Sequence, residues 1–465
     1  MNVLVVASDH VGSSMAGPGI RAYWFARELA KRFAVTLSVP YQTDLQADGF
    51  ELVVENPWDA HAMTNLATQF DALVAQRLPV PTLRALARSR TRTVYDLYDP
   101  VTIENLALDA GRRLGRAERA YFGLGTLVQK AVLVHGDAFV CASETQRDLW
   151  LGALLVLGRI DHRAYGGDPT LRALIDVVPF GLDPEPPEAG PGFRGVVPGI
   201  DETSKILLWP GGVWNWFDPL TVIRAVAELR RARDDVWLTF LGTRHPNERV
   251  PEMEMTGRAF ALAEELGVRD RGVHFNTGWV PYEARGAFLA EADVGVSAHF
   301  DDLETRFAFR TRLLDCFWAG LPVITTGGDA LARLVAERGV GRVVAAEDVA
   351  GWREAISALL DDGSALREAR HRLAAVRDEL AWPRAVEPLA RLLEGPPGRT
   401  GRPVDPTLGA YVARRVEYAL ASRGVAGAAR RVASIVAEQV ARRRPRRAEA
   451  PSPAVPSQRR AADDD

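Results

Sequence analysis

The stretch Asn2–Ala22 reads NVLVVASDHVGSSMAGPGIRA and points to the fold class. Its apolar start predicts a buried strand, and the apolar spacing after the loop predicts a helix. A strand, a glycine-containing loop and a helix, in this order, begin many phosphate-binding α/β folds. The stretch therefore predicts a first βα unit with a ligand-binding loop.

The letters of this loop exclude two familiar phosphate loops. Gly12 and Gly17 have the Walker spacing, but no lysine follows them. Gly17 and Gly19 give only the G-x-G part of a dinucleotide fingerprint. The third glycine of that fingerprint is missing after Arg21. We expect a loop that brings backbone close to a ligand, and the pattern disfavours a nicotinamide dehydrogenase.

The composition is that of an ordinary soluble protein. The chain has 465 residues, 47% hydrophobic and 25% charged, which suggests two domains. No apolar run reaches the length of a membrane-spanning helix, and no signal-type segment is evident. Cys141 and Cys316 stand in apolar surroundings, so we interpret them as structural thiols in a reducing cytoplasm.

Strand-like and helical segments alternate along most of the chain. Over the first 180 residues, short apolar runs alternate with helical spacing, which predicts βαβ units. A segment rich in Pro, Gly and Glu follows Pro179, and the alternation then resumes. We predict an α/β protein with Rossmann-like domains at residues 1–182 and 183–400, the final helix of the second packing back.

The C-terminal part has a different character. From Gly401 onward the chain carries 13 arginines and 7 acidic residues, against a net charge of −3 for the whole. We predict a basic helical extension over 405–445 and a disordered tail over 446–465. Such a helix either lies on an anionic membrane surface or packs, solvated, on the body of the protein.

Three segments resemble a known family. DVVPFGLD (176–183) resembles the turn that leads into the C-terminal domain of GT-B glycosyltransferases. FLAEADVGVSA (288–298) resembles a strand of that domain, and DCFWAGLPVITTGG (315–328) resembles its E-A-M-A-x-G-x-P-V-I-x-t segment. By these motifs the chain resembles the GT4-like family, glycosyl transferases group 1, over residues 1–395.

The resemblance implies the GT-B fold, two Rossmann-like domains facing across a cleft. It implies a nucleotide-diphosphate sugar as donor, bound mainly by the C-terminal domain, and a retaining transfer. In such transfers the departing diphosphate takes the proton of the acceptor, so no carboxylate dyad is required. We expect no cofactor and no protein-bound metal, the work of the protein being positioning and charge stabilisation.

The chain departs from the family's E-x7-E signature. Counting back from G-L-P, the second glutamate position is Asp315, whose shorter carboxylate we expect to accept hydrogen bonds from the donor ribose. The first position is Phe307, which cannot do so. Glu304 is the nearest acid, and we expect it to take the place of the missing glutamate near the sugar.

The family's G-R-x-x-x-x-x-K-G loop is also changed. The matching stretch is WPGGVWNWFDP, in which Gly211 and Gly212 form the turn and no cation follows. A desolvated diphosphate needs cationic partners, and three arginines near the next predicted helix offer them: Arg306, Arg310 and Arg312. The alternative is that these arginines solvate a helix start. Trp214 has two possible roles: its ring stacks on the sugar or the acceptor, or it packs against neighbouring elements.

The N-terminal domain offers the other candidates. We expect Gly17, Gly19 and Arg21 to form a lip of the cleft that faces the donor. Asp99 stands at a predicted strand end, where α/β enzymes place working residues, although an N-cap role is an alternative. His10, beside the loop, is a second catalytic candidate with an ordinary loop role as its alternative.

The sequence thus predicts a glycosyltransferase with a glycan, a lipid-linked molecule or a small molecule as acceptor. The alternatives are a non-catalytic GT-B module that binds sugar nucleotides and another GT-B enzyme such as a nucleotide-sugar epimerase. We expect a cytoplasmic protein without a nucleic-acid partner, with peripheral membrane contact through the basic extension. The nucleotide base, the sugar and the acceptor do not follow from the residues.

Overall fold

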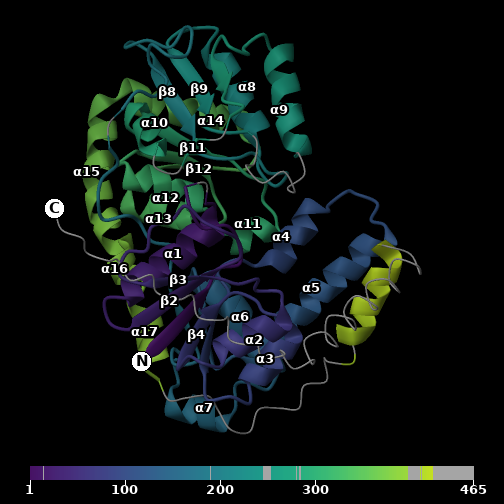
Figure 1. Ribbon diagram of the computed structural model, residues 1–465. Helices are drawn as coiled ribbons and strands as arrows, with labels where there is room; N and C mark the ends of the chain where they lie inside the picture. The colour runs from purple at the N-terminus through teal and green to yellow at the C-terminus, as the bar shows by residue number, and fades with distance from the viewer. Residues whose placement is uncertain are drawn as a thin grey trace, which may run out of the picture.

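A computed structural model describes residues 1–13, 15–188, 190–243, 253–278, 280–281, 284–395, 409 and 411–422. Two parallel sheets, each flanked by helices, lie one above the other in Figure 1. This confirms the predicted α/β class. The expected tail at 446–465, and the expected extension other than 409 and 411–422, lie outside the described residues.

The N-terminal sheet has seven strands in the order β3-β2-β1-β4-β5-β6-β7, all parallel. The order in which successive strands are added reverses between β1 and β4, and ligands of such sheets bind beside this switch point. The strands are β1 Asn2–Val6, β2 Ala34–Val39, β3 Glu51–Val54, β4 Ala72–Ala75, β5 Arg92–Asp96, β6 Ala138–Cys141 and β7 Ile175–Val177. The helices are α1 Gly17–Leu29, α2 Ala60–Ala67, α3 Val80–Leu86, α4 Val101–Leu108, α5 Arg116–His135, α6 Glu144–Val156 and α7 His162–Gly167.

The second sheet has six parallel strands in the order β10-β9-β8-β11-β12-β13, with its switch point between β8 and β11. Its strands are β8 Lys205–Trp209, β9 Val236–Phe240, β10 Val273–Phe275, β11 Val294–Ser297, β12 Val323–Thr326 and β13 Gly341–Val344. The helices after β8 are α8 Pro219–Leu229, α9 Glu254–Glu265, α10 Arg285–Glu291, α11 Leu303–Phe307, α12 Thr311–Trp318, α13 Ala330–Arg338, α14 Val349–Asp361, α15 Gly363–Leu380, α16 Trp382–Ala385 and α17 Glu387–Leu393.

The last two of these helices return to the N-terminal domain. In Figure 1, α15 runs down one side of the molecule and leads into α16 and α17 beside the lower sheet. Trp382 stacks on Trp24 of α1, with ring centroids 5.9 Å apart and an interplanar angle of 12°. Gly181 allows this approach, because a Cβ there would lie 2.3 Å from the Trp382 ring. One hydrophobic core therefore joins both domains.

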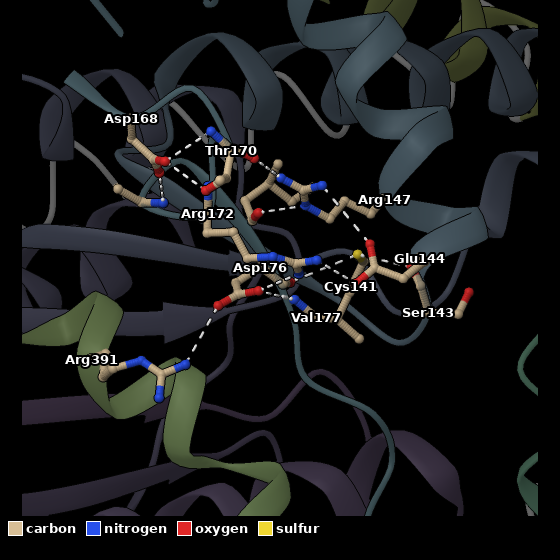
Figure 2. A network of polar contacts seen from close by, with 12 residues as sticks. Cys141, Ser143, Glu144, Arg147, Asp168, Thr170, Arg172, Asp176, Val177 and Arg391 are labelled. Carbon is tan, nitrogen blue, oxygen red and sulfur yellow. Dashed lines mark hydrogen bonds and ion pairs between the residues drawn. The ribbon is translucent and has the colours of Figure 1, made fainter. Parts of the chain in front are cut away.

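A polar network at the end of the N-terminal sheet also holds α17, as Figure 2 shows. Asp176 of β7 accepts a hydrogen bond from Arg172 at 2.6 Å and lies 3.7 Å from the guanidinium of Arg391 on α17. Arg172 also pairs with Glu144 at the start of α6, at 2.6 Å. The network ties β7 to α6 of the N-terminal domain and to α17, which follows the second domain in the chain.

The described part of the C-terminal extension, residues 411–422, is helical and packs on α5, beside which it lies in yellow in Figure 1. Tyr411 is buried in the N-terminal core, and the rings of Tyr418 and Tyr121 are 5.7 Å apart. Within the described ranges, no helix is long and apolar enough to cross a membrane.

Candidate active site

A cleft of about 770 Å³ lies between the two domains, at the carboxyl ends of both sheets. The N-terminal domain contributes the loops after β1 and β5 and the start of α4. The C-terminal domain contributes the loops after β8 and β9 and the start of α12. Both switch points therefore open into one cavity, which has the size and place of a ligand site.

The loop after β8 forms one wall of this cleft. Gly211 and Gly212 line it, as the sequence predicted for the phosphate turn. The Gly212 carbonyl accepts a hydrogen bond from Nη2 of Arg312 at 2.8 Å. This bond fixes the guanidinium beside the turn, where the family's own arginine and lysine are missing.

Arg312 is one of two arginines that line the cleft, and it is the one for which the sequence predicted contact with the diphosphate. Its guanidinium lies 3.7 Å from the centre of the Phe217 ring, so its charge is held against an aromatic face. Desolvation, and then the neighbouring charge of Arg310, lower the pKa of Arg312 to about 9. Its Nη1 is buried and has no hydrogen-bond partner among the described residues. An unsatisfied cationic donor at a cavity wall is suited to an anionic ligand.

Asp315 also lines the cleft, as predicted, and is held by a residue that the sequence analysis did not select. Nη1 of Arg285, at the start of α10, lies 2.9 Å from Oδ1 of Asp315. Burial raises the pKa of Asp315, while Arg285 and Arg312 oppose the rise. Arg285 stands just before the quoted FLAEADVGVSA segment, but only the fold brings it to Asp315.

Two tryptophans present a flat aromatic surface. Trp214 and Trp216 both line the cleft, and their rings are stacked with centroids 5.2 Å apart and an interplanar angle of 4°. Aromatic faces pack well on the C–H surfaces of sugars. Trp214 therefore both packs on a neighbour and borders the cavity, which combines the two roles that the sequence left open.

Asp99 lines the opposite wall together with Glu104, from the first turn of α4. The two carboxyl groups are close enough to shift each other's pKa. Burial raises the pKa of Asp99; burial and the charge of Asp99 raise that of Glu104 well above its usual range. Oδ1 of Asp99 is buried without a hydrogen-bond partner among the described residues.

The placement of Glu304 and Arg310 differs from the prediction. They form a buried pair, with Nη1 of Arg310 2.8 Å from Oε1 of Glu304 and Nη2 2.5 Å from Oε2. Neither lines the cleft. The chain turns between α11 and α12, so Arg310 points back at Glu304 instead of outward to a ligand.

Arg306 is likewise outside the cleft. It is exposed and borders a second hollow of about 590 Å³, together with Asp301, Asp302 and Arg333. Of the three arginines predicted to meet the diphosphate, only Arg312 is in the cleft. The others lie elsewhere because α11 is a short, separate helix whose exposed side faces this hollow.

Of the three residues predicted to form the N-terminal lip, Gly17 borders the cleft and the other two do not. Gly17 lines the cleft. A Cβ at Gly19 would lie 2.1 Å from the carbonyl oxygen of His10, so this glycine serves close packing. Arg21 is buried in a bidentate pair with Asp96, at 2.6 and 2.9 Å, and braces the loop rather than facing the cavity. His10 does not line the cleft either.

Metal ligation has no evident place in the described ranges. Within them, no three His, Cys, Asp or Glu side chains lie close enough together to hold a metal ion. The polar groups that converge on the cleft are instead one unsatisfied guanidinium, one arginine–carboxylate pair and one carboxyl pair. They can bind an anion on one wall and hydrogen-bond donors on the other.

Comparison with known proteins supports this architecture. WaaG, a glycosyltransferase involved in lipopolysaccharide biosynthesis, is 18% identical with a TM-score of 0.57, over 84% of this chain and 100% of its own. Anabaena Alr3699/HepE, solved in complex with UDP and glucose, is 14% identical with a TM-score of 0.62, over 84% of this chain and 99% of its own. The protein therefore has the GT-B fold.

The family match is more specific. Residues 204–362 match the family Glycosyl transferases group 1. The D-inositol 3-phosphate glycosyltransferase of Nocardia farcinica (strain IFM 10152) is 27% identical over 230 residues, 48% of each chain. The match thus spans about half the length of this curated relative. These findings confirm the resemblance to GT4-like glycosyltransferases that the motifs indicated.

Proposed function

We propose that this protein is a glycosyltransferase that moves a sugar from a nucleotide-diphosphate sugar to an acceptor. The observation that carries the proposal is the buried, unsatisfied Nη1 of Arg312 in the wall of the interdomain cleft. Beside it, the Asp315–Arg285 pair offers a carboxylate at the position of the family's second glutamate. The UDP and glucose bound by the Anabaena protein of the same fold agree with this donor class.

In this proposal the C-terminal domain holds the donor. Arg312 contacts the diphosphate, with Gly211 and Gly212 letting it approach the backbone. Asp315 accepts hydrogen bonds from the ribose, and Trp214 borders the sugar. Gly17 faces the donor from the other domain. Arg306 and Arg310, for which the sequence predicts contact with the diphosphate, have no part in this site.

We propose further that transfer retains the anomeric configuration and needs neither a cofactor nor a protein-bound metal. The departing diphosphate receives the proton of the acceptor, while Arg312 stabilises the charge that develops on it. Asp99 hydrogen-bonds and orients the acceptor. Closure of the two domains excludes water and limits hydrolysis of the donor.

The acceptor is a glycan, a lipid-linked molecule or a small molecule in this proposal, with polysaccharide biosynthesis as the expected role. We place the protein in the cytoplasm, with peripheral contact at the inner face of the membrane through the C-terminal extension. Exposed Val412, Val416 and Leu420 on the described part of that extension support the contact. No nucleic-acid partner is proposed.

Titration with nucleotides tests the donor site. Purified protein is titrated with UDP, GDP and dTDP and their common sugar conjugates by calorimetry. We expect saturable binding of one nucleotide, weakened at least about 30-fold in R312A, because a charge-assisted contact is worth roughly 2 kcal/mol or more. We expect D315A to weaken the nucleotide as well, whereas it should leave the affinity for inorganic pyrophosphate within about threefold.

The exposed Arg306 supplies the matched control for this titration. R306A removes an arginine from the neighbouring hollow and should leave nucleotide affinity unchanged. Binding that survives in R312A but is lost in R306A would contradict the assignment of the donor wall. If none of the nucleotides binds, the protein is a GT-B module without this donor.

A further inference from the structure

The two walls of the cleft differ in their ionisable groups. From the C-terminal domain, Arg285 and Arg312 line it together with Asp315. From the N-terminal domain, the lining includes Asp9, Asp99 and Glu104 and, among the described residues, no lysine, arginine or histidine. A phosphate-bearing donor fits the first wall. The second wall therefore faces the acceptor.

The pair of Asp99 and Glu104 offers an acceptor atom to a ligand. Oδ1 of Asp99 is buried and has no hydrogen-bond partner in the described structure. Val101 and Pro100, at the start of α4, hold the pair at the end of β5, where the backbone turns into the cleft. An acceptor hydroxyl or amine that donates to Oδ1 would satisfy this atom.

The surrounding charges do not make this wall basic. Arg77 is near enough to oppose the rise in the pKa of Asp99, but it does not line the cleft. Glu304 and Arg310, across the domain interface on and beside α11, act on Glu104 in opposite directions and neutralise each other in their buried pair. Asp96 is engaged by Arg21.

We propose that Asp9, Asp99 and Glu104 form an acceptor subsite that selects an unphosphorylated, polyhydroxyl acceptor, neutral or amine-bearing. The inference rests on the proposed glycosyltransferase function. A hydroxyl donates to Oδ1 of Asp99, and an ammonium pairs with the carboxyl groups of this wall, whose proton passes to solvent. A phosphate would place its negative charge beside Asp9 and the Asp99–Glu104 pair, where no cation of the N-terminal wall offsets it, so like-charge repulsion weakens its binding.

The expected acceptor preference of this chain differs from the one that the name of its curated relative indicates. The Nocardia protein is named for a phosphorylated acceptor, D-inositol 3-phosphate. The carboxyl-lined wall predicts the opposite preference here. Acceptor charge is therefore the property to measure, with matched compounds that differ by one phosphate group.

The experiment uses the full-length protein saturated with the nucleotide that it binds. NMR titrations compare glucose, glucosamine and glucose 6-phosphate, and separately myo-inositol and inositol 3-phosphate. We expect the phosphorylated member of each set to bind at least about 10-fold more weakly than its unphosphorylated partner, with glucosamine as tight as glucose or tighter. In D99N/E104Q we expect this difference to shrink to within about threefold.

Asp148, which borders the other hollow of the domain interface, provides the control. D148N should keep the wild-type discrimination. Tighter or equal binding of a phosphorylated member, no binding of any unphosphorylated member, or unchanged discrimination in D99N/E104Q would overturn the proposal.

The donor readout keeps the two hypotheses apart. D99N/E104Q should bind nucleotide as the wild type does, which also shows that the variant is folded. A protein that binds nucleotide but prefers the phosphorylated acceptors loses only the acceptor subsite. A protein that binds no nucleotide loses the proposed function itself.

Discussion

His299, at the end of β11, is fully buried, and neither of its ring nitrogens has a hydrogen-bond partner among the described residues. Its Nε2 lies 3.5 Å from Oδ2 of Asp329, the N-cap of α13, and Nε of Arg310 lies 3.8 Å from the same oxygen. Burial, reinforced by the charge of Arg310, lowers the pKa of His299 to about 2, so the ring stays neutral. Burial raises the pKa of Asp329 to about 6.

These shifts predict a stability that falls as pH rises. In the unfolded chain Asp329 ionises near its usual value of about 3.9, whereas in the folded protein it keeps its proton until about pH 6. The folded state thus binds more protons across this window, and stability drops by roughly 2 kcal/mol between pH 4 and 6 from this group. Urea unfolding at pH 4.5 and 7.5 should show a smaller drop in D329N, whose amide oxygen still caps Ala332.

The comparison with the wild type isolates this residue. Glu304 and Asp315 also have raised pKa values and remain in the variant. D348N, at the N-cap of α14, controls for loss of a capping carboxylate. An identical pH dependence in wild type and D329N would contradict the assignment.

Counting back from G-L-P located Asp315, and the cations missing from the glycine loop led to Arg312; both residues line the cleft. The sequence did not single out Arg285 or Glu104, because their roles depend on partners that tertiary folding brings near. Arg21 shows the reverse error. A basic residue beside a glycine loop suggested a ligand contact, but Asp96, from a distant strand, takes its guanidinium.

At the scale of elements, the buried strands were predictable and the break between two short helices was not. Buried apolar runs such as those of β1 and β8 carry their own signal. The segment 303–318 was expected to present one helix start, but it forms α11 and α12 with a break at 308–310. That break reverses Arg310 toward Glu304, and no local periodicity encodes it.

The proposed membrane contact of the C-terminal extension depends on its exposed face. Val412, Val416 and Leu420 recur every fourth residue and are exposed, while Tyr411 is buried on the opposite side. Residues 423–465 add ten arginines and five acidic residues. We expect co-sedimentation with vesicles containing phosphatidylglycerol, and its reduction at least about fivefold when 423–465 are removed, because polybasic segments bind anionic surfaces.

Vesicles of phosphatidylcholine alone are the control for charge, and V412S/V416S tests the apolar face while leaving Tyr411 in place. Equal sedimentation of the full-length and shortened proteins on anionic vesicles would remove the membrane contact from the proposal.

At the scale of the whole molecule, each of the two sheets has a switch point, and the two domains are joined by a shared hydrophobic core. The chain passes from the first domain to the second near Leu182, and Leu182 pairs with Ala381 on the return. Trp382 follows immediately and contacts Phe180, Trp24 and Phe25. The crossing is therefore a packed aromatic joint rather than a free linker.

This joint predicts coupled unfolding of the two domains. We expect a single calorimetric transition in the wild type and two separated transitions in W382A, since the truncation leaves a cavity where the domains share a core and costs about 3–5 kcal/mol. The bound nucleotide should raise the whole wild-type transition but only one of the two in W382A. W352A removes an equally buried tryptophan from the C-terminal core alone. It should lower stability without separating the N-terminal domain, and a single shared transition in W382A would show that the joint does not couple them.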